Sequence, residues 1–230
     1  MIIGILQPGY LPWLGFFEQM HRSDVFVFYD DVQYDKEGWR NRNRIKTANG
    51  IQWLTVPVYM EFEKHLPINE IKIDNTKNWK KKHLYSIIQN YSKAPFFAKY
   101  ISIFQEAYDK EWEFLVDINM YLIVKLANCL GMGNKTLLRS STLNITGDRI
   151  GRLIKICKFF GADIFYEGMS GKNYIDEAFF VNQGIKVEYQ NFNHPIYNQL
   201  YGEFIPYLSI VDLIFNTGDK SLSILTSLNM

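Results

Sequence analysis

The chain has 230 residues, of which 47% are apolar and 21% charged, and its formal net charge is +1. This length and composition predict one or two globular domains, and the small net charge argues against electrostatic capture of nucleic acid or of an anionic membrane. No run approaches the roughly 18 apolar residues of a membrane span, and the N-terminal MIIGIL is too short for the apolar region of a signal peptide. Cys129 and Cys157 lie among apolar residues outside any Cys-x-x-Cys pair, which predicts buried thiols in a reducing cytoplasm.

The first third of the chain predicts a βαβ unit followed by a hairpin. Two short apolar runs are typical of buried parallel strands, and the segment between them has the periodicity of a helix. An Asn-Gly pair between two strand-like runs is the strongest local hairpin signal. The expected elements are a strand at 2–6, a helix at 13–22, a strand at 25–29, a hairpin turning at 48–50 and a strand at 68–74.

The middle of the chain has the pattern of consecutive helices, and the last third alternates strands with helices. Glycines that end helices just before strands are typical of α/β units. The expected helices are 75–93, 95–109, 111–132, 147–161, 173–184 and one capped by Ser209, and the expected strands lie near 135–141, 162–168 and 185–192. We therefore predict a single α/β domain over 1–230, with an open, mostly parallel sheet flanked by helices, a β-hairpin, and a helical insertion at about 75–132.

Polar residues follow three of the predicted strands. Gln7 and Tyr10 follow the first, Asp30 and Asp31 the second, and 167–171 the strand ADIFY. Ligands of open parallel sheets bind outside the carboxyl ends of the strands. We therefore expect a pocket where these three ends meet.

Asp30, Asp31 and His83 are the candidate catalytic residues. An aspartate at a strand end can act as a general base toward an amine or hydroxyl, or hold Mg²⁺ through water; capping of the next turn is the alternative interpretation. Lys81 and Lys82 precede His83 at the start of a helix, where positive charge is unfavourable unless an anion lies nearby. Solvated lysines and a packed imidazole are the alternative. No cofactor is firmly predicted beyond Mg²⁺ or an activated acyl donor.

The segment WRNRNRIK at 39–46 is the densest local positive charge. In an extended segment, cations at every second position share one face, and arginine forks match the oxygens of a diphosphate. A charged edge strand that resists aggregation is the alternative. The expected ligand contacts of this segment are Arg40, Asn41, Arg42, Asn43, Arg44 and Lys46.

A proline-bound loop near the C-terminus adds further candidates. His194 precedes a proline, which holds it extended, and it shares the loop with Tyr197 and Gln199. We expect these three residues to face the ligand. No histidine pair has metal-binding spacing, and no Gly-x-Ser-x-Gly, Walker or Gly-x-Gly-x-x-Gly pattern occurs.

Several segments together carry a family resemblance. QPGYLPWLGFF, DVFVFYDDVQY, NRNRIKT, WKKKHLYSIIQNYSKAPFF and YEGMSGKNYI follow one another in an order that resembles the WbqC-like family over nearly the whole chain. The resemblance implies a bacterial cytoplasmic protein of surface-polysaccharide and lipopolysaccharide O-antigen biosynthesis. It further implies transfer of an acyl or aminoacyl group, such as glycyl, to the amine of a nucleotide-linked amino sugar. Gln7, Asp30 and Gln199 would then contact the sugar.

Two other functions stay open at the level of sequence. One is a non-catalytic protein that binds a nucleotide sugar or another enzyme of the pathway. The other is a sugar nucleotidylyltransferase, whose strand, Pro-rich loop, helix and strand the chain's opening resembles, although the paired His-x-x-His of those enzymes is absent. The expected partner is a nucleotide-linked amino sugar and not nucleic acid, and a homodimer is left open.

Overall fold

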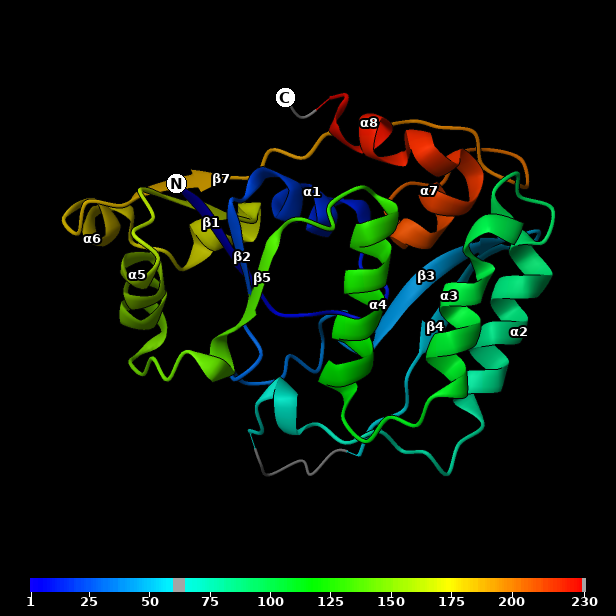
Figure 1. Ribbon diagram of the computed structural model, residues 1–230, viewed down its shortest axis with the longest axis horizontal. Coiled ribbons are helices and arrows are strands. Elements are labelled where there is room, and N and C mark those ends of the chain that lie inside the picture. The colour runs from blue at the N-terminus through cyan, green and yellow to red at the C-terminus, as the bar shows by residue number, and fades with distance from the viewer. Residues whose placement is uncertain (60–64, 229–230) are drawn as a thin grey trace.

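The computed structural model describes residues 1–59 and 65–228, and within them five strands form one parallel sheet (Figure 1). Their order is β5-β2-β1-β6-β7, and all four neighbouring pairs are parallel. The strands are β1 (Ile2–Leu6), β2 (Val25–Phe28), β5 (Thr136–Arg139), β6 (Ile164–Glu167) and β7 (Lys186–Tyr189). The predicted α/β class with a parallel sheet is confirmed.

Helices cover both faces of the sheet because successive strand side chains point to opposite sides. Ile3, Val27 and Phe165 belong to a core shared with α5 (Arg149–Phe159) and α6 (Glu177–Val181). On the other face, Phe26 and Phe28 join Phe16, Phe17 and Met20 of α1 (Leu14–Arg22) in a second, larger core. The near-continuous apolar run of β2 reflects this burial on both faces.

The hairpin β3 (Arg42–Thr47) and β4 (Gly50–Thr55) forms a separate two-stranded sheet, as predicted. Gly50 lies at φ 101°, a conformation that favours glycine. The larger core continues around this hairpin. Figure 1 shows the hairpin and most of the remaining helices on the side of the sheet away from α5 and α6. These helices are α2 (Trp79–Tyr91), α3 (Phe97–Asp109), α4 (Leu115–Cys129), α7 (Ile210–Thr217) and α8 (Ser221–Thr226).

The helices expected at 75–93 and 111–132 begin four residues later than predicted, at Trp79 and Leu115, and two further predictions about elements are wrong. The strand expected at 68–74 is a short 3-10 helix, Ile68–Glu70, followed by isolated bridges. Its backbone amides donate to the loop after β2, with Asn69 N 2.9 Å from the Asp30 carbonyl, and so the segment pairs with a loop. The helix expected at 173–184 begins only at Glu177, capped by Asp176, because a 3-10 turn occupies Met169–Asn173. In the described part of the chain, no helix is long and apolar enough to cross a bilayer.

Candidate functional site

The strand order places a topological switch point between β1 and β6. After β1, the chain continues to β2 on one side, and it later returns to β1's other side as β6. Gln7 directly follows β1, and Glu167 is the last residue of β6. Ligands of open α/β sheets bind in the crevice at such a point. The polar groups expected at three strand ends therefore do share one edge of the sheet.

The Pro- and Gly-rich loop after β1 is packed tightly against the segment that leads into the hairpin. A Cβ added to Gly9 would lie 3.0 Å from the Trp39 carbonyl oxygen, so a side chain there would separate the two segments. Leu11 adopts the left-handed region at φ 46°, and Asn43 Nδ2 donates to its carbonyl at 2.8 Å. The rigid loop thus fixes the arginine-rich segment beside the end of β1.

A pocket of about 470 Å³ opens between these two segments. Most of its lining is apolar or aromatic, and a few polar side chains enter it, which is typical of sites for small organic ligands. The lining residues are Leu6, Gly9, Pro12, Trp13, Phe16, Trp39, Arg40, Asn43, Arg44 and Tyr207. The pocket therefore lies beside Leu6, the last residue of β1, but its lining contains none of the polar residues expected at the three strand ends.

Arg40 and Arg44 are the two cations of this lining. Arg40 is half-buried; its Nε has no hydrogen-bond partner among the described residues, and burial is the main cause that lowers its pKa. The Arg44 guanidinium lies 4.6 Å from the Trp39 ring centroid and donates to the Tyr207 carbonyl at 2.8 Å. Arg44 Nε is also without a partner among the described residues, although the rest of its guanidinium is held by Trp39 and Tyr207.

The backbone of Arg40 is anchored from two directions. Its carbonyl accepts a 3.0 Å hydrogen bond from the Tyr10 N–H and a 2.8 Å bond from Asn119 Nδ2 of α4. The same Asn119 amide donates to the Pro8 carbonyl at 3.2 Å. One side chain of α4 therefore joins both segments that form the pocket.

Asn41, Arg42 and Lys46 of the arginine-rich segment do not belong to the pocket lining. The Arg42 guanidinium is 5.3 Å from the Trp53 ring centroid and donates to the Glu37 carbonyl. Lys46 is buried, and its Nζ donates to Gln199 Oε1 at 3.1 Å and to a backbone carbonyl. Asn41 Nδ2 donates to the carbonyl of Val56, the residue after β4, at 2.9 Å. The four cations predicted to share one face therefore have two different roles. Arg40 and Arg44 line the pocket, whereas Arg42 and Lys46 make contacts within the fold.

The loop that carries His194 packs against Tyr207, one of the residues that line the pocket. The His194 ring lies 5.2 Å edge-on from Tyr207, which lines the pocket, and its Nε2 is buried without a partner among the described residues. Tyr197 instead donates to Asp212 in the core at 2.9 Å, and Gln199 is engaged with Lys46. None of the three belongs to the pocket lining.

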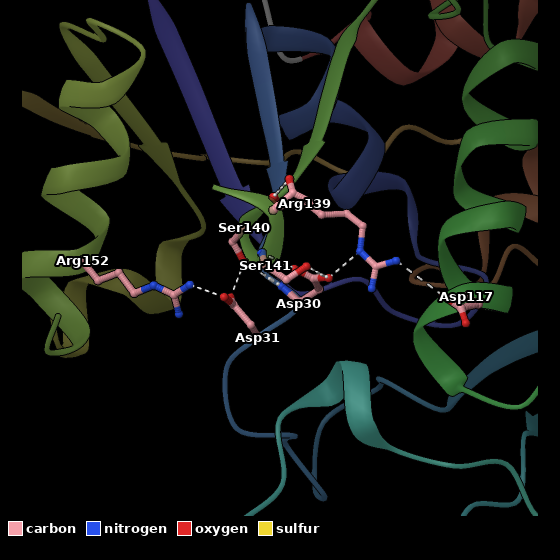
Figure 2. A network of polar contacts seen from close by, with 8 residues as sticks. Asp30, Asp31, Asp117, Arg139, Ser140, Ser141 and Arg152 are labelled. Carbon is pink, nitrogen blue, oxygen red and sulfur yellow. Dashed lines mark hydrogen bonds and ion pairs between the residues drawn. The ribbon is translucent and has the colours of Figure 1, made fainter. Parts of the chain in front are cut away.

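Asp30 and Asp31 form a closed network at the ends of β2 and β5 (Figure 2). Both oxygens of the fully buried Asp30 have partners: Arg139 Nε at 2.6 Å and both the amide and hydroxyl of Ser141. Burial raises the pKa of Asp30, but these hydrogen bonds outweigh it and the pKa is lowered. Asp31 pairs with Arg152. This arrangement suits a cross-link between strand ends better than a base.

His83 and Tyr10 meet in the core rather than at the pocket. The Tyr10 hydroxyl lies 2.8 Å from His83 Nδ1 and 2.5 Å from the Tyr108 hydroxyl, and all three side chains are buried. Burial lowers the pKa of His83 to about 4, so the imidazole is neutral at pH 7. Lys81 and Lys82 are exposed on α2 and do not line the pocket.

Glu167 is the residue at the switch point that the predicted catalytic set omits. It is 7% exposed, and burial raises its pKa to about 7. The Gly168 N–H, 2.9 Å from Oε1, acts in the opposite direction, as do the charge of Arg149, a hydrogen bond from Tyr174 and the charge of Arg40. The only signal in the sequence was an acidic residue ending a buried strand before a Gly-x-x-Gly turn.

No metal site is evident in the described ranges. Within 1–59 and 65–228, no group of three or more His, Cys, Asp or Glu side chains could hold an ion. The Asp30 and Asp31 carboxylates are instead paired with arginines.

Comparison with known proteins decides the family. The model of the WbqC-like protein family matches residues 7–224, a range that includes Arg40, Arg44 and Glu167. The chain belongs to the WbqC-like family. This WbqC-like protein is 36% identical, over 221 residues and 95% of each chain, to a Mycobacterium tuberculosis protein named "Uncharacterized protein Rv1507c". No solved structure matches the present chain.

Proposed function

We propose that this WbqC-like protein binds a nucleotide-linked amino sugar in the pocket beside β1 and transfers an acyl or aminoacyl group to the sugar amine. The resemblance to the WbqC-like family supports this reaction class and a place in surface-polysaccharide biosynthesis. The observation that carries the binding step is Arg40, a half-buried pocket cation whose Nε has no partner among the described residues.

A bound diphosphate would satisfy this arginine. A buried guanidinium without a hydrogen-bonded anion is costly, because burial removes its hydration. Arg40 and Arg44 line the same pocket, and guanidinium forks donate pairs of hydrogen bonds to phosphate oxygens. Two such forks suit the two linked phosphates of a nucleotide sugar.

The aromatic part of the lining supports the remaining portions of the ligand. Trp13, Trp39 and Tyr207 are large flat rings, against which a nucleobase or a sugar ring can pack. The Trp13 and Tyr207 centroids lie 5.9 Å apart, and Trp39 is braced edge-on by Trp53 at 5.0 Å. Preformed aromatic walls lower the ordering cost of binding.

A thermal-shift screen with uridine- and thymidine-diphospho amino sugars tests the binding step. A ligand at about 100 times its Kd should stabilise the protein by about 2.7 kcal/mol. Arg40→Lys keeps the charge but removes the fork, and we expect at least about tenfold weaker binding. Arg42→Lys is the matched control, because Arg42 does not line the pocket, and its affinity should stay at the wild-type level. No stabilisation of the wild type by any of these ligands at millimolar concentration would remove the proposal.

Turnover is measured separately from binding. The wild type is incubated with the amino sugar nucleotide that stabilises it best and with activated acyl donors, and the acylated product is identified by mass spectrometry. Product formation supports the transferase. Binding that is never followed by acylation with any donor favours the binding protein instead.

A further inference from the structure

The outer face of the hairpin is continuous with the pocket. Side chains alternate between the two faces of a strand, and Asn43 and Ile45 of β3 lie buried on the inner face. Arg42 and Arg44 belong to the outer face, where Arg44 is the register partner of Trp53 on β4. Arg44 also lines the pocket, and so the outer face and the pocket share a side chain.

The Trp53 ring on this face is held by its neighbours and is still open to solvent. The residue is 44% exposed, although its side chain is large and aromatic. Its ring centroid lies 5.0 Å, edge-on, from that of Trp39, which lines the pocket. The guanidinium carbons of Arg42 and Arg44 lie 5.3 Å and 5.7 Å from the Trp53 centroid. A flat ring that is fixed and accessible in this way can stack on a nucleobase.

The positive charges of Arg42 and Arg44 are incompletely compensated by the protein. The Nε atoms of both side chains are buried and have no hydrogen-bond partner among the described residues. Their guanidinium groups donate to two backbone carbonyls, at 3.2 Å and 2.8 Å. Within residues 1–59 and 65–228, arginine forms ion pairs at Arg139 and Arg152 and not at these two positions. The outer face therefore suits an anion, and guanidinium groups pair well with phosphate oxygens.

The acyl donor of the proposed reaction needs a site next to the pocket, because transfer requires both substrates to be held together. Activated acyl groups are carried as acyl adenylates or as thioesters of coenzyme A. Both carriers contain an adenosine with a phosphate on its 5′ oxygen, which combines a flat heteroaromatic ring with negative charge. The outer hairpin face has the complementary groups, an exposed indole ring and two guanidinium groups.

We propose that Trp53, Arg42 and Arg44 form a donor subsite, which binds the adenosine 5′-phosphate unit of the acyl donor; this inference rests on the function proposed above. The adenine ring stacks on Trp53, and the phosphate lies against the two guanidinium groups. Arg44 lies between the donor subsite and the pocket, 4.6 Å from the Trp39 centroid and 5.7 Å from that of Trp53. The donor and the nucleotide sugar therefore bind side by side, on either side of Arg44.

Titration calorimetry of the full chain with two adenosine nucleotides tests the donor subsite without turnover. Adenosine monophosphate is the nucleotide of an acyl adenylate, and adenosine 3′,5′-bisphosphate is the nucleotide end of coenzyme A. We expect the wild type to bind at least one of them, and the tighter ligand identifies the carrier. Absence of binding of both nucleotides at millimolar concentration would overturn the inference.

Substitution of Trp53 tests the stacking surface. Trp53→Leu should weaken binding of the tighter adenosine nucleotide by about tenfold, because stacking of one base on an aromatic side chain contributes this much to affinity. Ile51→Ala is the matched control, because Ile51 is also 44% exposed and lies on the same face of β4. This variant should bind with wild-type affinity. Equal nucleotide affinities of Trp53→Leu and the wild type would contradict the assignment.

Crossed measurements with two arginines separate the donor subsite from the pocket. Arg42→Lys should weaken the adenosine nucleotide by about tenfold and keep the affinity for the nucleotide sugar, whereas Arg40→Lys should do the reverse. A saturating nucleotide sugar, the one that stabilises the protein best, should leave the adenosine nucleotide bound. Displacement would mean that both ligands use the pocket, which would overturn the donor subsite and leave the nucleotide-sugar function standing. Failure to bind any nucleotide sugar would instead remove that function, while the Trp53→Leu titration still decides the subsite.

Discussion

The two halves of the sheet's carboxyl edge use acidic residues in opposite ways. At the ends of β2 and β5, Asp30 is fully buried and 2.6 Å from Arg139. At the switch point, Glu167 is almost as buried, yet the arginines that act on it form no ion pair with it among the described residues. The first site holds strands together, and the second keeps a buried acid whose pKa burial raises to about 7. The two sites both contain a buried carboxylate. They differ in whether an arginine is close enough to form an ion pair with it.

Asp30→Asn should produce the largest effect. Breaking a buried pair leaves a partner uncompensated, and we expect the free energy of unfolding to fall by about 3 kcal/mol in urea at pH 7. The control is Asp117→Asn, because that carboxylate is 3.5 Å from the same Arg139 and its side chain is 42% exposed. It should cost less than about 1 kcal/mol. Equal losses in the two variants would contradict the structural role of Asp30.

The pH dependence of that effect has a definite sign. The folded pKa of Asp30 lies below its ordinary 3.8, so its stabilisation is complete above that value and is lost as the pH falls through the folded pKa. The stability difference between wild type and Asp30→Asn should therefore be constant above about pH 5 and shrink below pH 4.

Glu167→Gln should act in the opposite direction. The folded pKa of about 7 lies above the ordinary 4.5, so the folded state binds more protons in that window and loses stability as the pH rises. Removing the titrating group should stabilise the free protein by about 3 kcal/mol at pH 8. The gain should vanish near pH 4, as followed by urea unfolding across this range. A destabilised variant at pH 8 would place Glu167 in the same class as Asp30.

Tyr108→Phe probes the buried group around His83 at a smaller scale. It removes the partner 2.5 Å from the Tyr10 hydroxyl but leaves His83 Nδ1 in contact with Tyr10. We expect a loss of about 1 kcal/mol in unfolding free energy and an unchanged nucleotide-sugar affinity. A large loss of nucleotide-sugar affinity without a loss of stability would instead indicate that Tyr10, His83 and Tyr108 take part in ligand binding.

Lys81→Ala and Lys82→Ala should have the smallest effects. Both side chains are exposed on α2, away from the pocket lining. Stability should change by less than about 0.5 kcal/mol, and ligand affinity by less than about twofold in the same thermal-shift titration. Clear weakening would mean that the anion reaches the start of α2.

Local patterns predicted the parts of this fold that depend on neighbouring residues. The hairpin follows from an Asn-Gly pair, and the parallel strands follow from short apolar runs. The spacing of Arg44 and Lys46 predicted a shared face, but spacing does not reveal which loop covers that face. Lys46 is buried under the 199–203 loop, whereas Arg44 reaches the pocket. The pKa of Glu167 likewise depends on the charges of Arg149 and Arg40, which are distant in sequence.

The Asn119 amide gives α4 a mechanical influence on ligand recognition. Its NH₂ group donates hydrogen bonds to the carbonyls of Pro8 and Arg40. The two segments that form the pocket are therefore both connected to α4. A substitution that shifts α4 along its axis would re-aim the Arg40 guanidinium without touching any bound molecule. Relatives that differ at such positions of α4 would then differ in ligand specificity, although these residues do not contact the ligand.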